Sequence, residues 1–101
     1  MFLFKKKNKI HEECYDLGFS FVEWLLPRLL VFKKDAGKCV DLEFHTFEYK
    51  GETFTQAQML DKLINATKYL SEHFYDWTDK TDQVQKEMLE IFSLIFPSLW
   101  W

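Results

Sequence analysis

The sequence predicts a mainly α-helical fold, a small three-helix bundle with a short β-hairpin or an irregular insert between the first and second helices. Apolar residues recur at helical spacing in three separate segments, and capping signals precede the second and third of them. Between the first two segments, residues 35–54 change to a short alternating pattern. A chain of 101 residues has the size of one domain, so we expect residues 1–101 to share one core.

The first predicted helix spans residues 16–34, where apolar residues occupy almost the whole circumference. The polar residues Ser20, Glu23 and Lys34 fall on one narrow stripe together with Pro27. This pattern predicts a central, largely buried helix. Because proline lacks a backbone N–H, we expect a bend near Glu23 on the solvent side.

Residues 35–54 have two interpretations. Val40, Leu42 and Phe44 alternate with acidic residues, and a Lys50-Gly51 turn follows, which is typical of a short hairpin. The competing interpretation is an extended loop whose aromatic side chains fill a gap in the helix bundle. An alternation this short does not decide between them.

The second and third predicted helices span residues 55–75 and 82–100. Thr55 with a glutamine three residues later is a capping-box signal, and Asp82 with Gln85 gives a similar start to the third helix. The short connection between the two helices predicts an antiparallel pair. Pro97 is expected to end the last helix in a frayed turn.

The composition is that of a folded protein with an aromatic core. Hydrophobic residues make up 48% of the chain and aromatic residues 19%, including eleven Phe and four Trp, which is far too apolar for a disordered segment. We expect Cys14 and Cys39 to be reduced thiols, because no secretory signal precedes them. The longest apolar run, residues 19–32, is interrupted by charge and is too short to cross a membrane. These features predict a cytoplasmic protein without a membrane partner.

The charge is distributed unevenly. Residues 1–10 form a basic arm with four lysines and no acid, so nine of the 13 Lys and Arg residues stand against all 16 Asp and Glu residues in 11–101, a formal charge of −7. An acidic body repels phosphate backbones, so we expect no direct nucleic-acid binding. It favours instead a partner protein with a basic surface.

The candidates for chemistry are weak. His11 and Cys14 lie one helical turn apart and Cys39 and His45 follow later, but this spacing matches no standard zinc site. No nucleophile elbow, phosphate-binding loop or metalloprotease motif occurs, and three scattered glycines do not form a phosphate cradle. We therefore expect neither an enzyme nor a bound metal or cofactor.

Two groups of residues are candidates for binding. The first is an aromatic and acidic surface near the C-terminus that would contact a target protein or a second copy of the chain, comprising Trp100, Trp101, Leu94, Glu87, Glu90, Asp76 and Asp79. The second is an anion site formed by Arg28, Lys33 and Lys34, in which Arg28 would hold phosphate unless it pairs with an internal acid.

The sequence also resembles a group of short tailed-phage and prophage proteins. The resemblance covers roughly residues 13–100 and rests on Trp24-Leu25-Leu26-Pro27-Arg28-Leu29, Phe32, Met59-Leu60-Asp61-Lys62-Leu63-Ile64, Leu89-Glu90-Ile91-Phe92 and Leu99-Trp100. The chain departs from the group in residues 37–54, which are longer and more aromatic, and in its lysine-rich start.

The resemblance implies a phage accessory protein that acts in the cytoplasm of an infected bacterium, and it implies no activity. Small acidic phage proteins without catalytic motifs are often inhibitors of host defence, so an anti-CRISPR or other anti-defence inhibitor is the leading hypothesis. The alternatives are a sponge that sequesters a nucleotide second messenger at the Arg28 site and a structural or assembly protein of the virion.

Overall fold

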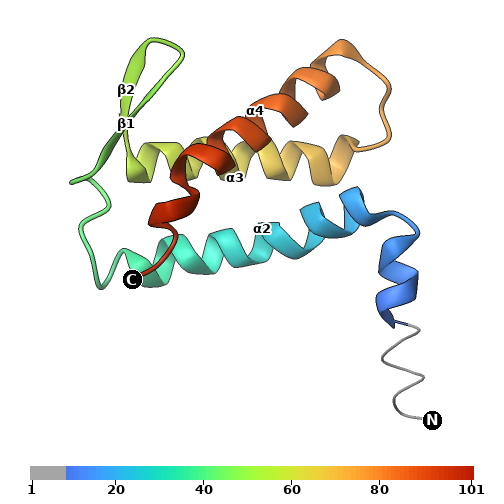
Figure 1. The fold of residues 1–101 in the computed structure, drawn as a ribbon, viewed down its shortest axis with the longest axis horizontal. Helices are drawn as coiled ribbons and strands as arrows, with labels where there is room; N and C mark the ends of the chain where they lie inside the picture. Colours follow the sequence, from blue (N-terminus) through green and yellow to red (C-terminus); the bar gives the residue numbers. More distant parts are fainter. Residues whose placement is uncertain (1–8) are drawn as a thin grey trace.

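A computed structural model describes residues 9–101. The elements, shown in Figure 1, are a short helix over residues 9–14, α2 (Leu17–Ala36), β1 (Thr46–Tyr49), β2 (Glu52–Thr55), α3 (Gln56–His73), α4 (Asp79–Ile95) and the 3₁₀ turn η1 (Phe96–Ser98). The predicted mainly helical fold is confirmed, and of the two interpretations of the insert the antiparallel hairpin between α2 and α3 is present. The expected small three-helix bundle is wrong, because a short helix precedes the three long ones and, in the described residues, the backbones of α2 and α4 are not in contact.

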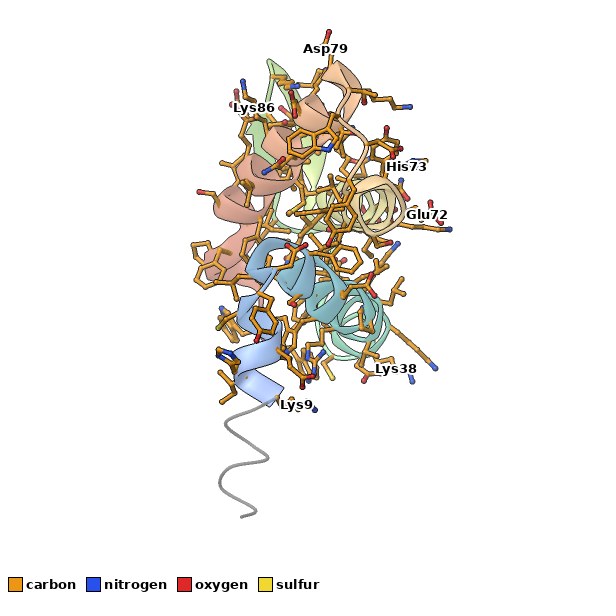
Figure 2. The ribbon with its side chains drawn as sticks, turned by 90° about the vertical axis from the view of Figure 1, so that its right-hand side faces the viewer. Lys9, Lys38, Glu72, His73, Asp79 and Lys86 are labelled. Atoms are coloured by element: carbon orange, nitrogen blue, oxygen red, sulfur yellow. The ribbon has the colours of Figure 1, made fainter. Side chains whose placement is uncertain are left out.

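The helices form an open arrangement around α3, which packs against both α2 and α4. In Figure 1, α4 crosses α3 diagonally and its C-terminal end approaches α2. Within the described residues, the backbones of α2 and α4 do not come into contact, which is why the helices do not close into a bundle. Figure 2 shows the molecule from the side. Its shortest dimension is 18 Å, which is about the thickness of two packed helices.

Helix α2 is only half buried, which corrects the expectation of a largely buried helix. Val22, Leu25 and Leu29 face the core at 4% exposure or less, whereas Trp24 and Val31 are more than half exposed. The sequence pattern shows that both faces are apolar, but only the arrangement around α3 decides which face is covered. The helix continues through the exposed Pro27 as one element.

The segment before the hairpin caps α3 instead of forming a strand. The carbonyls of Leu42 and His45 accept hydrogen bonds from the N–H groups of Ala57 (2.9 Å) and Gln56 (3.0 Å). These N–H groups lie in the first turn of α3, where a helix has no internal acceptors. The alternation of Val40, Leu42 and Phe44 therefore does not reflect a strand, and of these three only Leu42 is buried.

The hairpin itself is shorter than residues 35–54 and is built on a two-residue turn. Thr46 pairs with Thr55 and Tyr49 with Glu52. Lys50 and Gly51 both have positive φ, 53° and 80°, as a type I′ turn requires. A loop of this kind matches the right-handed twist of the two strands, so the Lys50-Gly51 pair was the correct turn signal.

Helix α3 supplies most of the large side chains that are fully buried. The predicted capping box is confirmed, since Thr55 Oγ1 accepts from Gln58 N and Gln58 Oε1 accepts from Thr55 N. Its fully buried residues are aliphatic apart from one threonine and comprise Met59, Leu60, Leu63, Thr67 and Leu70. Thr67 donates its buried hydroxyl proton to the Leu63 carbonyl at 2.7 Å, so this polar group is satisfied within the helix.

Substitution of Thr55 by alanine is expected to lower the free energy of unfolding by about 1 kcal/mol, because the Gln58 N–H loses its acceptor. Urea unfolding followed by circular dichroism measures the change. Thr53→Ala, in the exposed part of the same strand, is the matched control and is expected to change stability by less than about 0.5 kcal/mol. Equal effects of the two substitutions would contradict the capping role.

Helix α4 differs from the predicted 82–100 at both ends. It begins earlier because Thr78, not Asp82, is the N-cap, with Thr78 Oγ1 accepting from Thr81 N at 3.2 Å. Asp79 and Asp82 lie in the first turn, where negative charge stabilises the helix dipole. The helix ends at Ile95, and Pro97 lies within η1, because proline has no N–H with which to continue an α-helix.

The N-terminal prediction is only partly open to comparison. Residues 1–8 of the basic arm lie outside the described residues, and residues 9–14 form a short helix. None of the described helices combines the length and apolarity that crossing a membrane demands.

Candidate protein-binding site

The most informative property of this molecule is the exposure of its aromatic side chains. All four tryptophans are at least half exposed, from Trp24 at 51% to Trp77 at 95%. The largest fully buried side chains are aliphatic, methionine or threonine, so the expected aromatic core is only in part correct. The aromatic residues that pack against this core are partly buried and comprise Phe21, Phe32, Phe47, Tyr49, Phe54, Tyr69, Phe74 and Phe92. Large apolar side chains on a surface cost solvation free energy unless a partner covers them.

Three segments distant in the sequence build a pocket of about 360 Å³ at the C-terminal end of the molecule, which we call the end pocket. It lies between the segment before the hairpin, the start of α3 and the residues after α4. Its lining residues are Val40, Asp41, Phe44, His45, Gln56, Ser98 and Trp100.

Hydrogen bonds fix the frame of the end pocket. Gln56, only 4% exposed, donates from Nε2 to the Ser98 carbonyl at 3.0 Å, which ties η1 to α3. Trp100 donates from its indole Nε1 to the Pro97 carbonyl at 3.0 Å. The start of α3 and the η1 turn are thus fixed to each other, and the Trp100 ring is held in place without being covered.

The end pocket is apolar with an acidic edge. Phe44 and Trp100 are 76% and 72% exposed, and the Phe44 ring meets His45 edge-on at 5.2 Å. Asp41 orients its carboxylate by accepting from Glu43 N at 2.9 Å. Exposed aromatic rings next to a carboxylate suit an apolar segment that carries a basic side chain.

The residues predicted to form one C-terminal surface are divided between several places. Trp100 lines the end pocket, whereas Trp101 packs against Phe32 of α2 with ring centres 5.4 Å apart. Leu94, 40% exposed, lines a shallow depression next to the hairpin. The two tryptophans therefore face different surfaces.

The four acids predicted for this surface, Glu87, Glu90, Asp76 and Asp79, do not line the end pocket. Glu87 accepts from Lys50 Nζ at 2.9 Å and Glu90 accepts from the Tyr49 hydroxyl at 3.0 Å, which joins the hairpin to α4. Asp76 pairs with His73 at 2.8 Å, and Asp79 begins α4, at the edge of the molecule opposite Lys9 in Figure 2. The 17 residues of α4 separate Asp79 from the C-terminal tryptophans by about 25 Å.

The three basic residues of the predicted anion site do not converge. Arg28 donates from Nη1 to the Trp24 carbonyl at 2.9 Å and its guanidinium lies 4.4 Å from the Trp24 ring centre. Lys33 pairs with Asp61 of α3. At about 100° per residue, Lys33 and Lys34 lie far around the helix from Arg28.

The hairpin contacts with α4 raise two pKa values. The pKa of Tyr49 is raised above 10.0, mainly by partial burial and secondly by the hydrogen bond to Glu90. The hydrogen bond to Glu87 raises the pKa of Lys50 above 10.5. Because the folded state holds these protons more tightly than the unfolded chain, the stabilisation is complete below the unfolded pKa values and is lost as pH rises through the folded ones.

The Glu87→Gln variant is therefore expected to melt below wild type near pH 8, and the gap is expected to close as pH rises through the raised pKa of Lys50, above which the lysine is neutral in both proteins. Thermal unfolding at a series of pH values measures the gap. The exposed Glu72→Gln, whose carboxylate has no ion-pair partner in residues 9–101, serves as control. A gap that persists unchanged at high pH would exclude the ion pair as its source.

The metal candidates, all in the described residues, do not assemble into a group of three ligands. Within residues 9–101, no group of three or more His, Cys, Asp or Glu side chains is placed to hold a metal ion. Cys14 and Cys39 are exposed free thiols, and His11 is occupied by a 3.0 Å hydrogen bond with the Tyr15 hydroxyl.

The sequence indicated Trp100 but missed the rest of the end pocket. Val40 and Phe44 were assigned to a hairpin strand or an extended loop, and Gln56 lay within the predicted helix 55–75 without a role of its own. The available signal was the position of Gln56 directly after the Thr55 N-cap, where a side chain points back toward the preceding segment.

Comparison with known proteins gives no relative for this chain, since no family model, curated protein or solved structure matches it.

Proposed function

We propose that this chain acts by stoichiometric binding of another protein, and that the end pocket receives an apolar segment of that protein next to a basic side chain. The observation that carries the proposal is the pairing of two largely exposed aromatic rings, Phe44 and Trp100, with the carboxylate of Asp41 in one pocket of about 360 Å³.

The energetics support binding at this place. Aromatic side chains dominate the binding energy of interfaces because they bury large areas with few rotatable bonds. Here the hydrogen bonds of Gln56 and Trp100 hold the frame before any partner arrives, which reduces the entropy lost on binding. The acidic body adds attraction for a basic partner surface.

The biological setting that we propose is a phage accessory protein in the cytoplasm of an infected bacterium, most concretely an inhibitor of an antiviral defence system. Its support is the resemblance to short phage proteins, together with the acidic charge and the lack of catalytic motifs. The nucleotide sponge is less well supported, because Arg28 and Lys33 make separate contacts on different sides of α2.

Affinity capture from infected lysate, compared with matched variants, tests the proposal. Wild type is expected to retain a host protein that Trp100→Ala and Phe44→Ala bind at least about tenfold more weakly, the loss typical of a hot spot. Trp77→Ala removes the most exposed tryptophan, which lies on the α3–α4 connection outside the end pocket, and is expected to bind like wild type.

Three outcomes would overturn the proposal. They are a bait that retains no protein over a mock bait, a captured protein that Trp100→Ala retains equally, and recovery of the chain as a component of purified virions. The last would make it a structural or assembly protein. Circular dichroism of each variant separates loss of binding from loss of folding.

A further inference from the structure

Helix α2 presents an exposed seam with the spacing of a coiled coil, which we call the α2 seam. Its residues alternate in steps of four and three and comprise Leu17, Phe21, Trp24, Arg28, Val31 and Asp35. This heptad spacing keeps all six on one side of a helix. Leu17, Trp24 and Val31 are 64%, 51% and 56% exposed, whereas Phe21 is partly buried and meets Phe92 of α4 with ring centres 6.0 Å apart. Most of this helix face is therefore uncovered within the described residues.

Neighbouring aromatic residues widen this face. Phe96 and Trp101 are 59% and 54% exposed, and two adjoining hollows of about 270 and 460 Å³ run between them and α2, with Arg28 and Phe32 in both linings. Near the middle of the α2 seam, Trp24, Val31, Phe96 and Trp101 together expose roughly 400 Å² of apolar surface, at on the order of 100 Å² for each half-exposed large side chain. A specific interface takes about 800 Å² from each partner, somewhat more than half of it apolar.

The α2 seam carries one cation and one anion, each without an ion-pair partner in residues 9–101. Arg28 is held in place by the Trp24 carbonyl and ring, which occupy one of its donors and leave the others available. Asp35 lies seven residues further along the same stripe. Residues 1–8 contain no acid, so no carboxylate side chain from that segment can neutralise Arg28.

We propose that the occupant of the α2 seam is a second copy of this chain, bound with its α2 antiparallel. In a parallel pair, Arg28 would face Arg28 of the other copy and Asp35 would face Asp35, which is repulsive. In an antiparallel pair with the two-fold axis between Arg28 and Asp35, each Arg28 lies within about one helical turn of Asp35 in the other copy. The two helices then overlap over residues 27–36 with Val31 near the axis, and Leu17 and Phe21 lie outside the overlap. The seam is thus complementary in charge to itself in one orientation.

This inference is independent of the proposed function. The end pocket lies beyond the seam, and Val40, Phe44 and Trp100 are not part of the seam or its hollows. A dimer would present two end pockets, one on each copy. The Trp100→Ala variant is therefore expected to dimerise like wild type.

Charge reversal with sedimentation equilibrium tests the proposal. The full chain is expected to be a dimer at about 100 μM, whereas Arg28→Asp and Asp35→Arg are each expected to raise the dimer dissociation constant at least tenfold. Both sites are on the surface, and unchanged circular dichroism spectra of the variants show that folding is retained.

Two further measurements identify the seam and its orientation. A mixture of the two single variants places only opposite charges across the seam, so it is expected to form a heterodimer while each variant alone is monomeric. The double variant Arg28→Asp/Asp35→Arg is expected to recover the homodimer. A monomeric wild type, a dimer insensitive to both reversals, or a mixture that stays monomeric would each overturn the proposal.

Discussion

Replacement of Leu63 by alanine is expected to lower the free energy of unfolding by about 3–5 kcal/mol, the largest effect that we predict for a single side chain. Leu63 is fully buried on α3, and α3 is the helix that packs against both α2 and α4. A cavity at this position therefore weakens two helix interfaces at once. A domain of this size has only about 5–15 kcal/mol of stability, so much of it would be lost.

Urea unfolding measures this effect, and Leu89→Ala is its matched control. Leu89 is the same side chain on α4 but is 49% exposed, so its truncation is expected to change stability by less than about 1 kcal/mol. A loss of less than about 1 kcal/mol for Leu63→Ala would contradict the central position of α3, because it would mean that the helices repack without it.

The importance of α3 was also the most predictable feature of the fold. Its apolar residues occupy one face, its polar residues occupy the other, and Thr55 with Gln58 fixes its start. Local propensity, capping and burial all agree there. Helix α2 lacks this agreement. A helix with apolar residues on several sides has the same sequence pattern whether all of its faces are buried or one face is exposed.

The hairpin illustrates a different limit of sequence analysis. The Lys50-Gly51 turn was recognisable because the chemistry of a two-residue loop is local. The preceding alternation of Val40 and Phe44 was misleading, because the carbonyls of this segment are used by the first N–H groups of α3. That competition depends on a tertiary contact, and no periodicity in the sequence reports it.

The candidate site was predictable only in part, because three segments far apart in the sequence assemble it. Trp100 was predictable as a contact residue because it is an aromatic residue after the end of a helix. Asp76 and Asp79 were grouped with it on charge alone, although α4 separates them in space. Residues of one chemical type belong to one site only when the fold brings them together, and here the open packing of α2 and α4 around α3 decides this.

Gln56→Leu is expected to lower the free energy of unfolding by about 1–3 kcal/mol and to loosen the end pocket. The substitution keeps the size of the side chain but leaves the Ser98 carbonyl without its donor, and a polar group that loses its partner in a buried position costs about this much. Gln83→Leu, an exposed glutamine on α4, is expected to change stability by less than about 0.5 kcal/mol.

Amide hydrogen exchange distinguishes a local from a global effect of Gln56→Leu. The Leu99 and Trp100 N–H groups donate to the carbonyls of Phe96 and Ser98, and we expect both to exchange faster in this variant. Exchange in the buried centre of α3 is expected to accelerate only by the amount that the change in global stability gives. Because Trp100 then loses its fixed position, partner binding should weaken even where the protein is fully folded. Unchanged exchange at Leu99 and Trp100 would show that Gln56 does not hold this segment, and the rigidity of the end pocket would then have to come from the packing of η1 alone.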